Sequence, residues 1–369
     1  MSATRAVHRP DPWLLGTVLA LVGAGVVMVY SASAVLAMER YEQPYFFLSK
    51  QVTWAVAGVF GLAVMMRLDY RIYRQPTVIW TALLVAVVLL VAVLFSPPIN
   101  GTRRWFSLGG IGVQPSELAK LAVILFCAAI LERRMDRINE IGYAITPIAI
   151  VVTVVCGLIL REPDFGTALA LGLIVGVMVF AAGLTYRYLL GGALVMLPVL
   201  YTVVISAEYR RRRLLAFMNP WEDPLGDGFQ VIQSLIAVGT GGVTGRGLMG
   251  GVQKLFFLPE PHTDFIYAVI AEETGLLGAT AVLLCFCVIA WRGLRVSLRA
   301  PDRFGAFMAL GLTTMLTLQA FVNISVVLGL LPTKGIPLPF VSAGGSSLLS
   351  SLVGMGILLN VSQHASAEA

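Results

Sequence analysis

The chain has 369 residues, of which 58% are hydrophobic and only 12% are charged. A soluble domain carries about twice that share of charged residues, so the composition excludes an ordinary soluble globular protein. The net charge of +6 suits anionic lipid surfaces and anionic substrates, and in such a protein it does not indicate nucleic-acid binding. The apolar residues come in blocks of roughly 18 to 25, the length that crosses a bilayer core about 30 Å thick. The sequence therefore predicts an all-α polytopic membrane protein.

The apolar blocks predict about ten membrane-spanning helices. They cover residues 13–35, 47–66, 77–95, 115–132, 143–160, 165–182, 186–205, 264–291, 304–330 and 341–361. Short loops on the side of the N-terminus hold roughly twice as many Lys and Arg residues as those on the other side, so both termini are expected to be cytoplasmic. We expect one membrane domain, residues 1–369, with a large extracytoplasmic loop at about 206–263 between the seventh and eighth spans.

The loop before the fourth span is the first that carries candidate site residues. Its candidates are Arg103, Arg104, Trp105, Glu117 and Lys120. Ser116 follows Pro115 and is expected to cap the next helix, on which Glu117 and Lys120 lie three apart, share a face and can pair. A different interpretation makes the loop an interfacial anchor, with an aromatic-belt tryptophan and two snorkelling arginines.

Two further loops are informative. The turn at residues 161–166, with the sequence Arg-Glu-Pro-Asp-Phe-Gly, fits a turn whose charges neutralise one another as well as it fits a functional site.

In the large loop, residues 208–217 predict a short basic helix, and residues 230–238 are apolar at helical spacing and are expected to lie at the membrane surface. The glycine run 239–251 formally contains G-x-G-x-x-G, but no strand precedes it, so a dinucleotide site is excluded.

The segment 258–265 is the predicted centre of the function. It places Glu260, His262 and Asp264 directly before a long apolar run, and ionisable groups at the mouth of a spanning segment indicate a functional site. Pro259 and Pro261 prevent regular helix there, so Thr263 is expected to cap a helix that begins near Asp264 and holds it at the membrane surface. The loop 331–340 contains three prolines, cannot be a continuous helix, and brings Lys334 to the same face.

This combination of residues predicts glycosyl transfer from a lipid pyrophosphate. The cations expected to hold the pyrophosphate are Arg103, Arg104, Lys120, Arg246, Lys254 and Lys334, with Glu260 and His262 beside them. Asp264 is the expected general base, which would accept a proton from the attacking hydroxyl, and a single base predicts inversion at the sugar carbon. No cofactor is required by the sequence, although a divalent cation, Mg or Mn, could share the pyrophosphate charge with Asp264 or Glu260 as an oxygen ligand.

These segments together resemble the SEDS family (shape, elongation, division and sporulation) over nearly the whole chain. The resemblance rests on residues 30–33, 104–105, 114–120, 259–265, 331–335 and 344–347. It implies ten spans and an enzyme that polymerises lipid II into a growing glycan strand, working with a class B penicillin-binding protein (a transpeptidase) and other division proteins. It also implies a multi-pass location in the bacterial cytoplasmic membrane, at the division septum, with the site on the extracytoplasmic face. The family's essential aspartate falls on Asp264 and its essential loop tryptophan on Trp105, and Glu117 is the glutamate of its Gln-Pro-Ser-Glu motif.

Within that family, residues 253–262 and 331–335 resemble the division branch, and an elongation polymerase of the same chemistry is the second choice. Ala343 and Thr274 depart from the usual tyrosine and leucine and weaken the assignment to a branch. Two other classes remain as alternatives. A flippase for the same lipid would need a polar path through the bilayer and often shows inverted repeats, neither of which is evident. A non-catalytic division scaffold would use the basic face for docking.

Overall fold

The computed structural model describes residues 9–98, 102–108 and 111–365. In these residues ten long helices match the ten predicted spans one for one. They are α1 (Pro12–Tyr41), α2 (Phe46–Arg67), α3 (Pro76–Val93), α4 (Pro115–Arg134), α5 (Ile141–Arg161), α6 (Phe165–Ala181), α7 (Tyr186–Ile205), α10 (Ile266–Arg299), α11 (Arg303–Val327) and α12 (Gly345–His364). Eight are long and apolar enough to cross a membrane; the exceptions are the short α6 and the more charged α4. The prediction of an all-α polytopic membrane protein is confirmed.

The remaining elements are short. They are the 3-10 helices η1 (Tyr70–Arg74) and η2 (Met135–Arg137), the loop helices α8 (Glu208–Met218) and α9 (Phe229–Gly241), and the strands β1 (Phe106–Leu108) and β2 (Ile111–Val113). The two strands form an antiparallel hairpin that the sequence did not predict. Both helices predicted in the large loop are confirmed.

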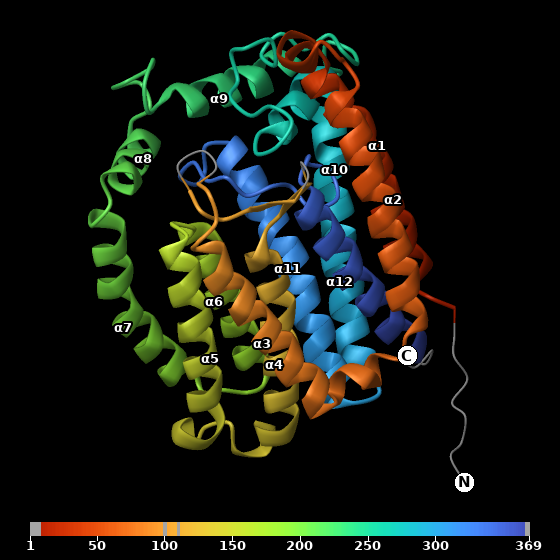
Figure 1. The fold of residues 1–369 in the computed structure, drawn as a ribbon, viewed down its shortest axis with the longest axis vertical. Coiled ribbons are helices and arrows are strands. Elements are labelled where there is room, and N and C mark those ends of the chain that lie inside the picture. The colour runs from red at the N-terminus through yellow and green to blue at the C-terminus, as the bar shows by residue number, and fades with distance from the viewer. Residues whose placement is uncertain (1–8, 99–101, 109–110, 366–369) are drawn as a thin grey trace.

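The helices α10, α11 and α12 form the centre of the bundle, with α1 and α2 on one side and α3 to α6 on the other (Figure 1). The helix α12 packs closely on α2 because it presents glycine there: a Cβ on Gly356 would lie 2.6 Å from the carbonyl oxygen of Leu62. The start of α1 lies beside the last turn of α12, since the Asp11 amide donates to the Ser362 hydroxyl at 3.1 Å. The start of α1 and the end of α12 therefore lie at one end of the bundle.

The helix α10 consists of two helices that meet at Gly275, which has a φ of 67°. The Tyr267 hydroxyl donates to the Ala279 carbonyl at 3.1 Å, although a straight helix would separate residues twelve apart by about 18 Å. The chain therefore folds back sharply at Gly275, and residues 266–274 form a half-helix about 13 Å long. The prediction of a helix that begins near Asp264 is confirmed, since α10 starts at Ile266, but the sequence did not predict its interruption at Gly275.

The break in α10 is filled by the glycine-rich segment 242–247. Its backbone replaces the missing helical partners: the Arg246 amide donates to the Glu272 carbonyl at 3.0 Å, and the Leu276 amide donates to the Gly242 carbonyl at 2.9 Å. Close approach requires glycine here, because a Cβ on Gly245 would lie 2.1 Å from the Glu273 carbonyl oxygen. The glycine run thus secures the large loop to α10.

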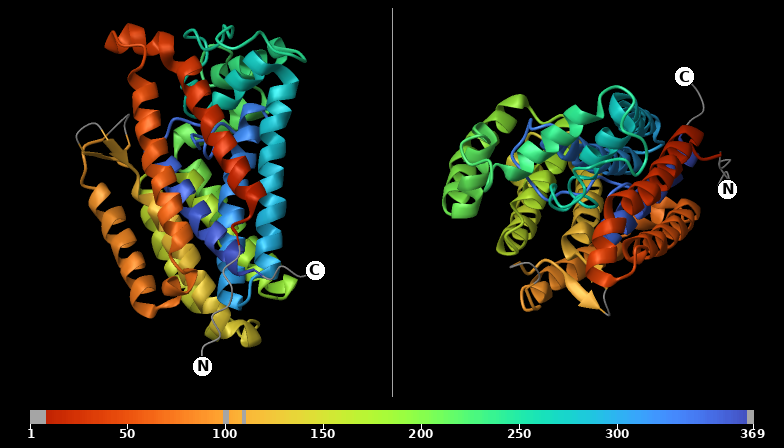
Figure 2. Two further views of the ribbon diagram at one scale, coloured as in Figure 1. Left: turned by 90° about the vertical axis from the view of Figure 1, so that its right-hand side faces the viewer. Right: turned by 90° about the horizontal axis from the view of Figure 1, so that it is seen from above.

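At the opposite edge of the bundle, α7 stands apart from the other helices, and α8 and α9 lead from it across the upper end (Figures 1 and 2). None of the residues of α7 is buried. A hydrogen bond from the Tyr209 hydroxyl on α8 to the Pro163 carbonyl, 3.1 Å long, ties this arm to the turn before α6. The helices α7 and α8 therefore lie across a space from α6 and α11.

Candidate functional site

A polar cavity of about 670 Å³ opens where the loops of the upper end converge on the bundle. The chain segments that line it include the ends of α4 and α6, the helices α8, α9 and α11, and the loops 260–265 and 334–337. The predicted site residues that line it are Arg104, Trp105, Glu117, Lys120, Glu260, Asp264 and Lys334. Residues far apart in the sequence thus face one space.

The loop that carries Asp264 is fixed through three consecutive carbonyl groups. The carbonyl of His262 accepts from the Ala343 amide (2.9 Å), that of Thr263 from the Ser342 hydroxyl (2.6 Å), and that of Asp264 from the Asn323 side-chain amide (2.8 Å). The same Asn323 amide also donates to the Ile336 carbonyl at 2.7 Å. Asn323 therefore joins the Asp264 loop to the loop that carries Lys334.

The carboxylate of Asp264 lies directly against Gly335, where a Cβ would be 2.8 Å from Oδ2. Burial raises the pKa of Asp264 to about 7, with a further increase from the charge of Glu260, while Arg213 and Arg104 oppose the shift. A carboxyl group with a pKa near neutrality can both accept and release a proton, as a general base must do.

If Asp264 is the predicted base, replacing Asn323 by leucine is expected to lower the kcat of the predicted glycosyl transfer about 10- to 100-fold with little change in binding of the predicted lipid substrate. Leucine has a similar volume but donates to neither carbonyl, so the Asp264 loop loses its connection to residue 336 and the carboxylate of Asp264 shifts. The kcat and KM of the reconstituted protein are the measurement. Thr317→Val on the same helix is the matched control, because the Thr317 hydroxyl binds only backbone carbonyls within α11. Equal losses in the two variants would contradict a positioning role for Asn323.

Three cations face the cavity without a carboxylate partner among the described residues. Arg104 donates to the carbonyls of Glu162 (2.9 Å) and Pro163 (2.5 Å), which leaves part of its guanidinium free. The Lys334 ammonium lies 4.8 Å above the ring of Phe165, and Arg213 comes from α8. Burial lowers the pKa of Lys334 to about 8, against the opposing effect of Asp164. The three positive charges are available for an anionic ligand.

Part of the cavity wall is a hydrogen-bonded network in which the charges of Glu117 and Lys120 neutralise each other. The predicted pair of Glu117 and Lys120 is confirmed: both are buried, with Nζ and Oε1 2.8 Å apart. Lys120 also donates to Gln319 at 3.0 Å, and Ser350 donates to Glu117 at 3.0 Å. Because Lys120 is already neutralised, it contributes less to binding an anion than the three unpaired cations.

The turn at residues 161–166 is not self-neutralised. Asp164 accepts from the Thr167 amide (3.2 Å) and hydroxyl (2.8 Å) and so caps α6. The Glu162 carboxyl group is buried and has no hydrogen-bond partner among the described residues. Burial raises the pKa of Glu162 to about 8, and the charge of Asp164 raises it further, against the effect of Arg104. Of the charged residues in the turn, Asp164 alone lines the cavity.

Four predicted site residues lie outside the cavity. Arg103 is exposed and donates to the Leu94 carbonyl at 2.9 Å, and the His262 ring packs on Phe47 with 4.4 Å between ring centroids. Arg246 lies 3.5 Å from Glu272, and Lys254 forms a buried pair with Glu273 at 2.5 Å. The six predicted cations are thus not one cluster: three line the cavity, Arg246 and Lys254 attach the large loop to α10, and Arg103 does neither.

Both predicted helix caps are wrong. Ser116 lies inside α4, where its hydroxyl accepts from the Gln114 side-chain amide at 3.0 Å. Thr263 binds Glu260 and leaves the start of α10 without a side-chain cap. Each hydroxyl is instead bonded to a side chain two or three residues earlier in the chain, so neither is free to cap a helix.

The sequence analysis missed several residues that line the cavity. They are Asp164, Thr167, Tyr209, Arg213, Gln230 and Gln319. The only signal for Arg213 was the run of four arginines at 210–213, and nothing in the run distinguishes the one that faces the cavity.

The described residues contain no group of three or more His, Cys, Asp or Glu side chains that could hold a metal ion by themselves. Asp264 and Glu260 line the same cavity, and Mg²⁺ is often bound by one or two carboxylates together with substrate phosphates. These two side chains would hold such an ion, which would add positive charge beside a pyrophosphate.

The bundle and its cavity define a polytopic helical membrane protein with a polar cavity that is lined by Asp264 and by the cations Arg104, Arg213 and Lys334. The family model described as FTSW_RODA_SPOVE, cell cycle protein, matches residues 12–367, so the chain belongs to this family.

The sequence matches to similar proteins cover nearly the whole chain. The chain is 45% identical to a probable peptidoglycan glycosyltransferase FtsW of Geobacter metallireducens, covering 97% of this chain and 96% of the relative. It is 42% identical to stage V sporulation protein E of Bacillus subtilis, covering 96% and 97%.

Among solved structures, a chain described under "Structural coordination of polymerization and crosslinking by a peptidoglycan synthase complex" is 34% identical, with a TM-score of 0.79 and coverage of 96% and 97%. The rod shape determining protein RodA of Thermus thermophilus is 29% identical, with a TM-score of 0.71 and coverage of 97% and 98%.

Proposed function

We propose that this chain is a peptidoglycan glycosyltransferase that polymerises lipid II into glycan strands for septal wall synthesis. The names of its relatives support the reaction class. The observation that carries the proposal is the position of Asp264: its carboxylate faces one cavity with Arg104, Arg213 and Lys334. A base beside a set of unpaired cations fits the transfer of a sugar from a pyrophosphate.

In this reaction Asp264 accepts the proton of the acceptor hydroxyl as that oxygen attacks the sugar carbon of the donor. The bond from this carbon to the pyrophosphate oxygen breaks, and the pyrophosphate leaves with the electron pair. Arg104, Arg213 and Lys334 stabilise the negative charge that develops on it. Trp105, whose ring packs on Gly112 of the hairpin, supplies an apolar wall for a sugar ring.

The setting that we propose is the bacterial cytoplasmic membrane at the division septum, with both termini cytoplasmic and the cavity facing outward. We propose a class B penicillin-binding protein as the partner that cross-links the product. The solved complex that coordinates polymerisation and crosslinking supports this pairing.

Polymerisation of purified lipid II by the reconstituted full-length chain, with and without a cognate transpeptidase, tests the proposal. We expect glycan strands from the wild-type protein under at least one of the two conditions. If the protein binds lipid II but makes no polymer even with the partner, the enzyme proposal is wrong and a scaffold or flippase role replaces it.

The pH dependence of kcat/KM is expected to be bell-shaped. Activity rises through a pH of about 7, because the base Asp264 must lose its proton, and it falls above about 8, because Lys334 must keep its proton to bind the pyrophosphate. In Lys334→Arg the alkaline limb should move to higher pH, since arginine stays protonated. A profile that is flat from pH about 6 to about 9 would contradict these two assignments.

A further inference from the structure

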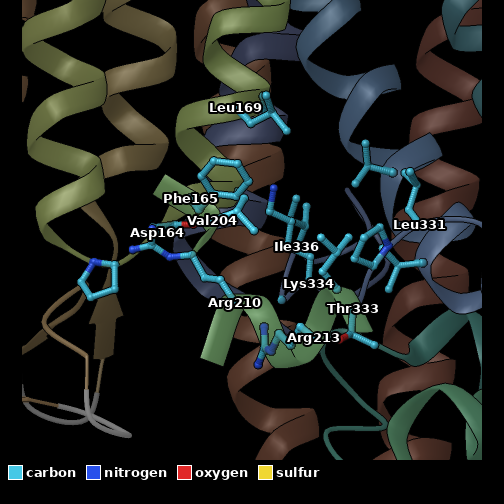
Figure 3. A pocket seen from close by; sticks show the side chains of 18 of the residues that line it. Asp164, Phe165, Leu169, Val204, Arg210, Arg213, Leu331, Thr333, Lys334 and Ile336 are labelled. Carbon is cyan, nitrogen blue, oxygen red and sulfur yellow. The ribbon is translucent and has the colours of Figure 1, made fainter. Parts of the chain in front are cut away.

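A second cavity, of about 360 Å³, adjoins the polar one and is lined mostly by apolar side chains from α6, α7, α8, α11 and the loop 331–336. Figure 3 shows Phe165, Leu169, Val204, Leu331 and Ile336 around this space. We call it the apolar groove. It suits a hydrocarbon chain, because burial of each methylene group contributes about 0.8 kcal/mol.

The apolar groove meets the polar cavity at three cations. Arg104, Arg213 and Lys334 line both spaces, as does the carboxylate of Asp164, which accepts hydrogen bonds from Gln114 and Thr167. Neither Arg213 nor Lys334 makes an ion pair or donates a hydrogen bond to any described residue, and Arg104 donates to backbone carbonyls alone. A ligand that places a chain in the groove therefore places its anionic head between these cations.

We propose that the apolar groove holds the polyprenyl chain of the donor, so that Arg104, Arg213 and Lys334 bind the pyrophosphate that departs. The inference rests on the proposed function. Both substrates carry a lipid and a pyrophosphate, but only the donor's pyrophosphate becomes a leaving group and gains charge during the reaction. Unpaired cations stabilise the transition state only if they bind that pyrophosphate.

The remaining walls of the polar cavity then belong to the acceptor. They include Trp105, Gln114 and Gly344, none of which lines the groove. Asp264 lines the polar cavity and not the groove, and it lies against Gly335, which lines both, so it is placed to reach the hydroxyl of the acceptor. The acceptor oxygen bonds to the donor's sugar carbon, and its proton goes to Asp264. The bond from this carbon to the pyrophosphate oxygen breaks, and the polyprenyl pyrophosphate that is released keeps its head at the three cations and its chain in the groove.

The assignment makes Arg213 a substrate-binding residue delivered by α8. The hydrogen bond from Tyr209 to the Pro163 carbonyl positions this helix beside the junction. The neighbouring Arg212 offers a matched comparison, because it lies on the same helix, lines neither cavity and pairs with Asp227 at 3.5 Å.

Two lipid II analogues, each limited to one role, test the proposal in the reconstituted full-length protein. The donor analogue has the attacking hydroxyl methylated, and the acceptor analogue has a methylene group in place of the oxygen that joins the sugar to the pyrophosphate. Together they give a single coupled product, so the KM of each can be measured while the other is saturating.

Two substitutions should act on the donor alone. Leu173→Trp narrows the groove and Arg213→Ala removes a cation, and each should raise the KM of the donor analogue at least about tenfold while the KM of the acceptor analogue stays within about twofold. The controls Leu197→Trp, on an exposed part of α7, and Arg212→Ala should change neither value. An increase confined to the acceptor analogue, or no increase at all, overturns the proposal.

Crosslinking gives a readout that does not depend on turnover. A photoreactive amino acid at position 173 should label polyprenyl pyrophosphate, the donor's leaving group, and the same amino acid at position 197 should not. If the wild-type protein fails to couple the analogues but position 173 is labelled, the proposed function fails while the groove assignment stands. Absence of labelling at position 173 in an active protein overturns the groove assignment.

Discussion

Replacing Asp264 by asparagine is expected to abolish polymerisation of lipid II while binding of lipid II stays within about twofold of wild type. The amide keeps the volume of the carboxylate but cannot accept the proton of the attacking hydroxyl, and the loss of a general base lowers rates by about 10²- to 10⁴-fold. The backbone carbonyl of Asp264 keeps its bond to Asn323, so the loop should stay in place. Product formation and equilibrium binding, measured on the same reconstituted preparation, separate catalysis from binding.

Glu260→Gln is the matched control, because Glu260 lines the same cavity and is exposed. Its charge raises the pKa of Asp264, so its removal should shift the acid limb of the activity profile to lower pH. Glutamine keeps an oxygen at the position where the carboxylate would hold a divalent cation, so polymerisation should stay in place. If Asp264→Asn polymerised as fast as the wild type, Asp264 would be structural, and Glu260 and Glu117 would become the candidates for the base.

The parts of the fold that depend on local pattern could be predicted from the sequence. The spans follow from apolar blocks of membrane-crossing length, and the α8 and α9 helices follow from helical spacing in the large loop. The pair of Glu117 and Lys120 was predictable because residues three apart on one helix share a face.

The composition of the cavity wall could not be predicted, because it depends on contacts between distant segments. Lys254 was expected in the pyrophosphate site, but it is paired with Glu273, nineteen residues away, because the chain folds back at Gly275 and brings the two carboxylates of α10 to the loop. Arg213 faces the cavity only because α8, which follows α7 at the edge of the bundle, is held beside the turn before α6 by the bond from Tyr209 to the Pro163 carbonyl. A list of basic residues on one face does not distinguish cations that are neutralised from those that are free.

Replacing Lys254 by methionine is expected to lower the free energy of unfolding by about 3–5 kcal/mol, because Glu273 would remain buried with an uncompensated charge. Glu273 also accepts from the Ser31 hydroxyl (2.7 Å) and the Met249 amide (3.0 Å), bonds that a glutamine can largely retain without a charge. The double variant Lys254→Met, Glu273→Gln should therefore recover most of the lost stability. Thermal unfolding in detergent, followed on the three proteins, is the measurement.

The same variants decide where Lys254 acts. If it secures the loop to α10, Lys254→Met should unfold at lower temperature, and the double variant should recover both stability and polymerisation. If Lys254 instead binds the pyrophosphate, Lys254→Met should unfold like the wild type and bind lipid II more weakly, and the change at Glu273 should restore neither. The 2.5 Å contact between Lys254 and Glu273 and the burial of both residues favour the first result.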